Sequence, residues 1–182
     1  MLETYVALLR GINVGTSGRL AMSDLRDLVA GLGFSDVRTV LNSGNVVFDS
    51  PGIGADAACL RIQEALAERL GLSARVIVLS AAELVDVVAD NPLGKIATNP
   101  SRLIVAFPAA ADDMRRLDPL LELDWAGEAL AVGRRAAYLW CPDGVVASPV
   151  AKALGRALGD SVTSRNWSTV GKLHSLVTSR GA

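Results

Sequence analysis

Two segments of the chain place arginine and asparagine where the backbone is suited to binding an anion. In the first, LLRGINVGTSGR (8–19), Arg10 ends a short apolar run and three glycines follow before the next helical pattern. A glycine-rich turn that leads into a helix presents backbone N–H groups to an anion, and the planar arginine fork suits carboxylate or phosphate. The segment matches neither the P-loop nor the dinucleotide-binding pattern. For the glycines we therefore favour the alternative of a permissive crossover turn.

The second segment, TSRNWSTVGKL (163–173), opens the last predicted helix. Asn166 or Ser164 can cap this helix, and the positive end of the helix dipole together with Arg165 favours an anion there. Arg165 and Asn166 could equally be structural anchors. Both interpretations stay open.

The remaining polar candidates also have structural alternatives. Arg10 can pair with a carboxylate such as Asp49, since buried arginines are seldom without a partner. Asn13 tolerates left-handed turns and bonds its own backbone. The tip Asn42-Ser43-Gly44-Asn45 (42–45) is typical of a hairpin turn, and its residues alone favour that interpretation over a binding site.

Nothing in the sequence identifies a reaction. The only histidine, His174, has no triad-like or metal-like partner spacing, and Cys59 and Cys141 form no CxxC pair. We expect no metal site and no cofactor, and we leave open whether the protein is an enzyme.

The bulk composition limits the class of protein. The 182 residues are 51% hydrophobic with a formal net charge of −1, which suits one domain or two small ones and argues against a protein that coats nucleic acid. From Pro149 onward, however, five basic residues stand against one acid. No apolar run approaches a membrane span, and we identify no signal peptide. We expect a cytoplasmic protein with reduced cysteines.

The first half of the chain follows the order βαββαβ. Strands are predicted over 5–10, 36–41, 45–48 and 74–79, with helices from a Ser23 cap to Gly33 and over 56–70. A third helix begins with the capping box Ser80-Ala-Ala-Glu83 and stops at Asn91-Pro92.

After a linker at 91–101 the same order returns. Strands are predicted over 102–107, 128–132 and 136–140, with a short extended piece at 161–164. Helices are predicted over 112–117, from Ser148-Pro149 to Gly159, and in a last segment. The prediction is an α+β fold of two ferredoxin-like (βαββαβ, α/β plait) units packed together with a C-terminal helix. The predicted domains are 1–90, the linker 91–101, and 102–182. Both faces of the first strand are apolar, so we expect both to be covered.

Three segments together resemble the signatures of a bacterial family, domain of unknown function 1697 (DUF1697): LLRGINVG near the start, VLNSGNVVF (40–48) and TSRNWSTVGKL (163–173). The resemblance runs from Met1 to about Arg180 and includes YLWCPDG (138–144). It implies tandem ferredoxin-like units and names no activity. The first loop departs from the family, with NVGTSGR where relatives often have NVGGKN. The resemblance is also the reason to keep Ser43 and Asn45 as site candidates.

The favoured hypothesis is a protein that binds a small anionic ligand, such as a nucleotide or phosphorylated metabolite. Polar residues of the three signature segments would form the site: Arg10, Asn13, Ser43, Asn45, Arg165 and Asn166. The alternatives are a nucleic-acid-binding plait module, which the net charge disfavours, and a structural or protein-interaction unit. We expect no membrane partner and leave the oligomeric state open.

Overall fold

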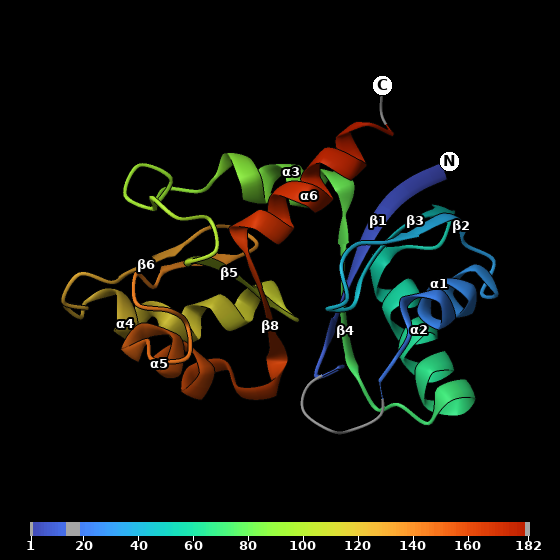
Figure 1. Cartoon of the computed structure of the whole chain (residues 1–182), viewed down its shortest axis with the longest axis horizontal. Coiled ribbons are helices and arrows are strands. Elements are labelled where there is room, and N and C mark those ends of the chain that lie inside the picture. Colours follow the sequence, from blue (N-terminus) through green and yellow to red (C-terminus); the bar gives the residue numbers. More distant parts are fainter. Residues whose placement is uncertain (1, 14–18, 181–182) are drawn as a thin grey trace. The chain divides into compact units, whose positions relative to one another are not determined.

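The computed structural model describes residues 2–13 and 19–180, which form two compact α+β units (Figure 1). The first unit contains the chain up to Leu84 and again from Lys172 onward, and the second contains Val85–Gly171. Helices α3 (Ala81–Ala89) and α6 (Trp167–Thr178) therefore each contribute residues to both units.

The first unit is built on a four-stranded antiparallel sheet. Its elements in chain order are β1 (Leu2–Arg10), α1 (Met22–Ala30), β2 (Ser35–Thr39), β3 (Asn45–Pro51), α2 (Ala55–Leu70) and β4 (Arg75–Ser80). The strands lie in the order β2-β3-β1-β4, so β1 pairs with both β3 and β4. This is the βαββαβ plait predicted from the sequence.

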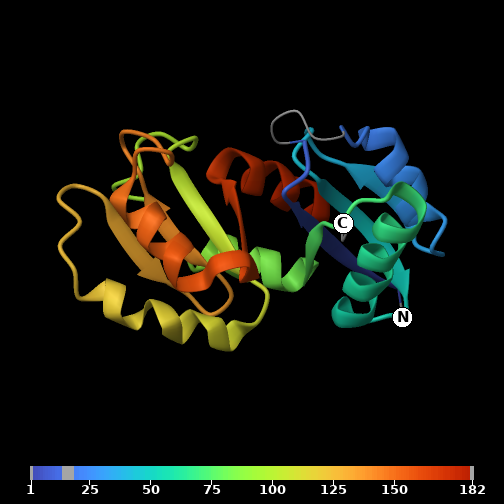
Figure 2. The same ribbon diagram turned by 90° about the horizontal axis from the view of Figure 1, so that it is seen from below.

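The two helices of this plait cover one face of its sheet (Figure 2). The core formed with α1 and α2 includes every second side chain of β1, namely Tyr5, Ala7 and Leu9. Val6 and Leu8 point to the opposite face and are also fully buried. The prediction that both faces of β1 are covered is confirmed.

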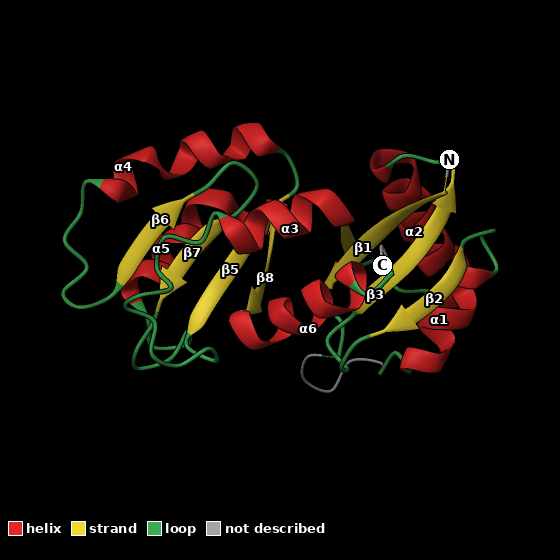
Figure 3. Cartoon of the chain, turned by 90° about the horizontal axis from the view of Figure 1, so that it is seen from above, coloured by secondary structure: helices red, strands yellow, loops and turns green. Residues whose placement is uncertain are grey.

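The second unit repeats the plan. Its elements are β5 (Leu103–Pro108), the 3-10 helix η1 (Ala111–Leu117), α4 (Asp118–Leu121), β6 (Ala129–Val132), β7 (Ala137–Trp140), α5 (Pro149–Leu158), the 3-10 turn η2 (Gly159–Ser161) and β8 (Val162–Asn166). The strand order β6-β7-β5-β8 matches that of the first sheet (Figure 3). The predicted fold class of two ferredoxin-like units with a C-terminal helix is confirmed.

One face of the second sheet packs against η1 and α5. The core on this face contains inward side chains of β5, β7 and β8. It also contains Met114 and Leu117 of η1 and Leu154 of α5. Tyr138 lies on the opposite face of β7 and is fully buried. Apolar side chains at helical and strand spacing therefore produced both cores.

Local capping signals were mostly correct. Ser80 and Glu83 form the predicted capping box, with Glu83 Oε2 accepting from the Ser80 N–H at 2.8 Å and Ser80 Oγ from the Glu83 N–H at 3.1 Å. Ser148 caps α5 by accepting from the Ala151 N–H at 3.1 Å. The Ser23 cap was wrong, because α1 already begins at Met22 and has no side-chain cap.

The compact units and the predicted domains divide the chain at different places. The second unit begins at Val85, inside α3, and the first unit resumes at Lys172, inside α6. The predicted boundaries at 90/91 and 101/102, and the assignment of the C-terminal helix to the second domain, stay predictions.

Candidate functional site

Asn13 closes the glycine-rich loop. Its backbone has a left-handed φ of 55°, its Oδ1 accepts from the Leu20 N–H at 2.7 Å, and its Nδ2 donates to the carbonyls of Leu20 (3.1 Å) and Asn42 (3.0 Å). The side chain thus joins both ends of the loop and ties them to the β2–β3 connection. Gly15 and Gly18 of the predicted anion cradle lie outside the described residues.

Asn45 holds the β2–β3 connection in the same way. It is fully buried, and its Nδ2 donates to the Val40 carbonyl at 2.8 Å and to Ser43 Oγ at 2.9 Å. The Leu9 N–H donates to the Gly44 carbonyl at 2.8 Å, so the turn is bonded to β1. The hydrogen bonds of Asn45 show its structural role, and they place Ser43 beside it.

Arg10 ends β1 directly opposite Arg75 on β4. Like charges directly across an antiparallel pair are unfavourable, so this register concentrates positive charge at one end of the sheet. Asp49, the carboxylate considered as a partner for Arg10, lies opposite Thr4 toward the other end of β1. It forms an ion pair with Arg180.

In the second unit, Arg165 is a buried cation within β8. Its backbone lies opposite Val105, and the residue is only 8% exposed. Nη1 donates to Thr163 Oγ1 at 3.0 Å and to the Ser164 carbonyl at 2.8 Å. Burial lowers the pKa of Arg165 to about 10, because desolvation disfavours the charged form. The guanidinium is still cationic at neutral pH.

Asn166 is the cap of α6. Its Oδ1 accepts from the Thr169 N–H and from Thr169 Oγ1, both at 2.9 Å. This is the hydrogen bond of an N-cap residue, so the capping interpretation of Asn166 is confirmed. Whether Asn166 also contacts a ligand stays a prediction.

The structure therefore groups the predicted residues unit by unit. Asn13, Ser43 and Asn45 meet at the end of the first sheet where Arg10 completes β1. Arg165 and Asn166 are consecutive in β8 of the second unit. That these groups form one binding site stays a prediction.

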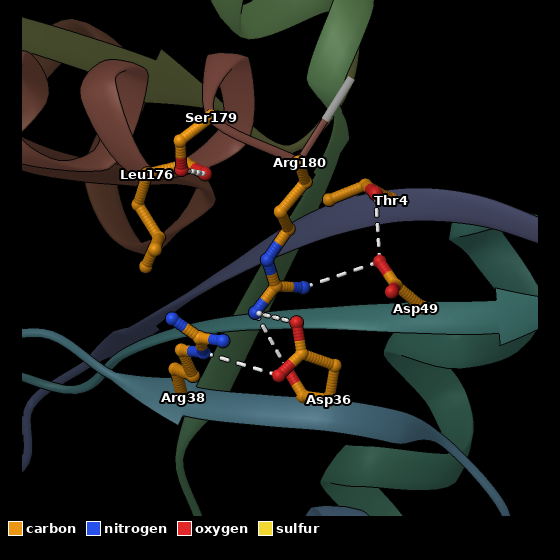
Figure 4. A network of polar contacts seen from close by, with 7 residues as sticks. All are labelled: Thr4, Asp36, Arg38, Asp49, Leu176, Ser179 and Arg180. Atoms are coloured by element: carbon orange, nitrogen blue, oxygen red, sulfur yellow. Dashed lines mark hydrogen bonds and ion pairs between the residues drawn. The ribbon is translucent and has the colours of Figure 1, made fainter. Parts of the chain in front are cut away.

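A cluster that sequence reasoning missed lies on the first unit (Figure 4). Arg180, just past the end of α6, forms ion pairs with Asp36 on β2 and Asp49 on β3. The three residues are far apart in the sequence, and each type is common at surfaces. No spacing in the sequence could have indicated the contact.

The thiols are not activated as nucleophiles. Burial raises the pKa of both Cys59 and Cys141, which keeps the sulfur protonated, whereas reactive cysteines have a lowered pKa. Among the described residues, no group of three or more His, Cys, Asp or Glu side chains is placed to hold a metal ion. No helix in the described ranges is long and apolar enough to cross a membrane.

Tyr138 gives the second unit a measurable alkaline sensitivity. Its hydroxyl donates to the Val87 carbonyl at 2.7 Å, and burial, assisted by the charge of Asp90, raises its pKa from 10.0 to about 12. Between these values the unfolded tyrosine loses its proton and the folded one keeps it, so stability falls as pH rises. We expect Tyr138→Phe to lower the free energy of unfolding by about 1 kcal/mol at pH 7. We also expect that free energy to fall less steeply in Tyr138→Phe than in wild type between about pH 10 and 12.

The measurement is urea unfolding of wild type and Tyr138→Phe from pH 7 upward. The difference between the two proteins isolates Tyr138 from other groups that titrate in this range, such as Tyr5, whose pKa burial also raises to about 12. If the free energies of unfolding of the two proteins fall in parallel as the pH rises, the Tyr138 phenol titrates alike in the folded and unfolded chains. That result would contradict the prediction.

Comparison with known families settles the relationship of the chain. A family model described as protein of unknown function (DUF1697) matches residues 2–138 of the 182. The chain belongs to the DUF1697 family. The signature segments around Arg10 and at 40–48 lie inside the matched range, and the segment at 163–173 lies beyond it.

One solved structure supports the same fold. The conserved bacterial protein SP0830 from Streptococcus pneumoniae is 20% identical, with a TM-score of 0.77, over 97% of this chain and 99% of that chain. At this identity the likeness shows the DUF1697 fold alone. A proposed chlorite dismutase, TA0507, is 14% identical over the same shares of the two chains, and its TM-score of 0.22 is too low to indicate a shared fold. No curated protein matches the chain significantly.

Proposed function

We propose that the protein binds a small anionic ligand, such as a nucleotide or a phosphorylated metabolite, and that Arg165 is the cation that recognises it. The observation that carries the proposal is the position of Arg165, a buried cation in β8 next to Asn166, which caps the N-terminus of α6. A guanidinium and the positive end of a helix dipole both favour a bound anion.

The hydrogen bonds of Arg165 suit this role. Nη1 donates to Thr163 Oγ1 and to the Ser164 carbonyl, and these two bonds orient the planar guanidinium. A preoriented guanidinium loses less entropy when it binds phosphate or carboxylate, and charge-assisted bonds are the stronger ones. Arg165 is thus suited to the recognition of a phosphoryl group.

Arg10 is the second cation of the proposal. The register that places it opposite Arg75 puts two cationic residues at neighbouring strand ends, where positive charge favours an anion. Asn13, Ser43, Asn45 and Asn166 remain ligand candidates by their place beside Arg10 or Arg165. The bonds that Asn13, Asn45 and Asn166 make give them a structural role first.

The alternatives are weaker for a structural reason. A plait that reads single-stranded RNA needs aromatic side chains on an accessible sheet face. On the faces opposite the core helices, Val6, Leu8 and Tyr138 are fully buried. The free cysteines Cys59 and Cys141 also suit the reducing cytoplasm, which we propose as the location.

The test compares thermal unfolding with inorganic phosphate, pyrophosphate, ATP and GTP. At least one anion should raise the wild-type midpoint in a saturable way, because a ligand that binds the folded state stabilises it. Arg165→Gln should weaken that ligand about 10- to 100-fold, the size of one or two charged hydrogen bonds. Arg156→Gln, at an exposed position on α5, is the control and should bind as wild type does.

Two results would reject the proposal. One is a midpoint that no anion moves in wild type. The other is an Arg165→Gln protein that binds as tightly as wild type. If Arg165→Gln does not fold, Arg165→Lys retains the charge without the fork and should still weaken binding. Tighter binding of a single-stranded RNA oligonucleotide than of any mononucleotide would favour the nucleic-acid alternative.

A further inference from the structure

An arginine at the C-terminal end of the described chain forms ion pairs with two strands of the first sheet. Arg180 Nη1 lies 3.1 Å from Asp49 Oδ1, and Nη2 lies 2.6 Å from the Asp36 carbonyl oxygen and 3.2 Å from Asp36 Oδ2 (Figure 4). The Arg180 side chain is only 8% exposed. One guanidinium therefore bridges two neighbouring strands, 131 and 144 residues away in sequence.

An irregularity in β2 creates half of this contact. The β2–β3 register shifts between Ser35 and Arg38, and Asp36 adopts a left-handed φ of 43°. Bulges re-aim side chains and leave backbone groups outside the strand ladder. At Asp36 both the carbonyl and the carboxylate accept from the same Arg180 nitrogen.

Neighbouring side chains hold the two carboxylates in position. Thr4 Oγ1 donates to Asp49 Oδ1 at 2.6 Å, and Arg38 Nε donates to Asp36 Oδ1 at 3.0 Å. The Asp49 side chain is only 15% exposed. An Asp49 carboxylate left without Arg180 would be a partly buried charge that accepts from one hydroxyl, which is unfavourable.

We propose that Thr4, Asp36 and Asp49 form a guanidinium receptor, filled by Arg180 as a latch that holds the end of α6 on the first unit. The latch is reversible because one of its two carboxylates, Asp36, has a second charged partner. Arg38 keeps Asp36 paired when Arg180 leaves, and Asp36 is 41% exposed. Arg180 Nε is buried with no hydrogen-bond partner among the described residues. The closed latch therefore leaves one donor of Arg180 without a hydrogen bond in the described part of the chain. When the latch opens, Asp49 is the one of the two carboxylates that keeps no charged partner among the described residues.

The receptor selects a guanidinium over an ammonium by shape. Asp36 and Asp49 approach different nitrogens of Arg180, which a planar fork with fixed donors allows. A lysine ammonium is a single point donor on a flexible stem, so it cannot present two separated nitrogens to two strands. Arg180→Lys should therefore weaken the latch even though it conserves the charge.

The experiment is hydrogen exchange of the last turn of α6 in Arg180→Ala. Loss of the charged hydrogen bonds should speed exchange there about 10- to 100-fold and leave β5–β8 unchanged. Lys172→Ala, at an exposed position of the same helix, is the matched control and should exchange as wild type does. Millimolar methylguanidinium should slow the exchange of Arg180→Ala again, and methylammonium at equal concentration should not.

Two outcomes would overturn the proposal. In one, exchange of the last turn of α6 in Arg180→Ala equals that of wild type. In the other, methylammonium rescues as well as methylguanidinium does, which would make the site a general cation site. If Arg180→Ala does not fold, Arg180→Lys gives the same reading: faster exchange supports the latch, and exchange equal to wild type rejects it.

Discussion

Replacing Phe48 with alanine is expected to destabilise the first unit by about 3–5 kcal/mol, the usual cost of truncating a buried phenylalanine. Phe48 is fully buried in β3, with the Phe34 ring 4.6 Å and the Tyr5 ring 6.0 Å from its own, centroid to centroid. The substitution removes the apolar side chain and leaves a cavity beside Tyr5 and Phe34. It also removes both aromatic contacts, which carry stabilisation beyond their buried area.

Urea unfolding can assign this loss to the correct unit. All three tryptophans, Trp125, Trp140 and Trp167, lie in the second unit, so their fluorescence reports that unit directly. Far-ultraviolet circular dichroism reports both units. The control is Leu60→Ala on α2, where the leucine is 57% exposed and truncation should cost less than about 0.5 kcal/mol. A Phe48→Ala protein as stable as Leu60→Ala would contradict the described core.

Replacing Gly44 with alanine is expected to cost about 2–4 kcal/mol, from backbone strain and overpacking together. Gly44 has a φ of 76°, and an added Cβ would lie 2.6 Å from Ile12 Cδ1 and 2.8 Å from Leu9 Cβ. The Leu9 atom is fixed to the strand and cannot move aside. The glycine is therefore required where the β2–β3 connection meets β1.

A double-mutant cycle separates the two causes. Ile12→Val removes the nearest atom, so Gly44→Ala should be less damaging in that background, while the strain and the Leu9 contact remain. Denaturant midpoints of wild type, the two single variants and the double variant give the coupling free energy between positions 12 and 44. If Gly44→Ala changes stability by less than about 0.5 kcal/mol in wild type, this turn is not packed as described.

Much of the fold was predictable because local signals agreed with one another. Apolar alternation placed Tyr5, Ala7 and Leu9 on one face of β1, and the capping box at Ser80 marked the start of α3. The repeated βαββαβ order then required two plaits. The Ser23 cap failed because α1 already begins at Met22, and element ends depend on local geometry that composition describes poorly.

The site was less predictable than the fold. The sequence could suggest that Asn13 and Asn166 serve a turn and a cap, and their hydrogen bonds agree. It could not show that Arg165 is buried, since burial depends on everything that packs around a strand. The Arg180 latch was hidden for a further reason. A bulge at Asp36 creates the receptor, and no pattern in the residue types marks that bulge.

The most direct test of anion recognition observes the Arg165 side chain itself. The Nε–H signal of Arg165, assigned in the proton–nitrogen spectrum by its loss in Arg165→Lys, is followed during titration with pyrophosphate and with ATP. We predict a saturable shift of that signal, with the exposed Arg156 signal unchanged at the same concentrations. An Arg165 signal that stays in place at saturating anion, or one that moves no more than that of Arg156, would contradict the account.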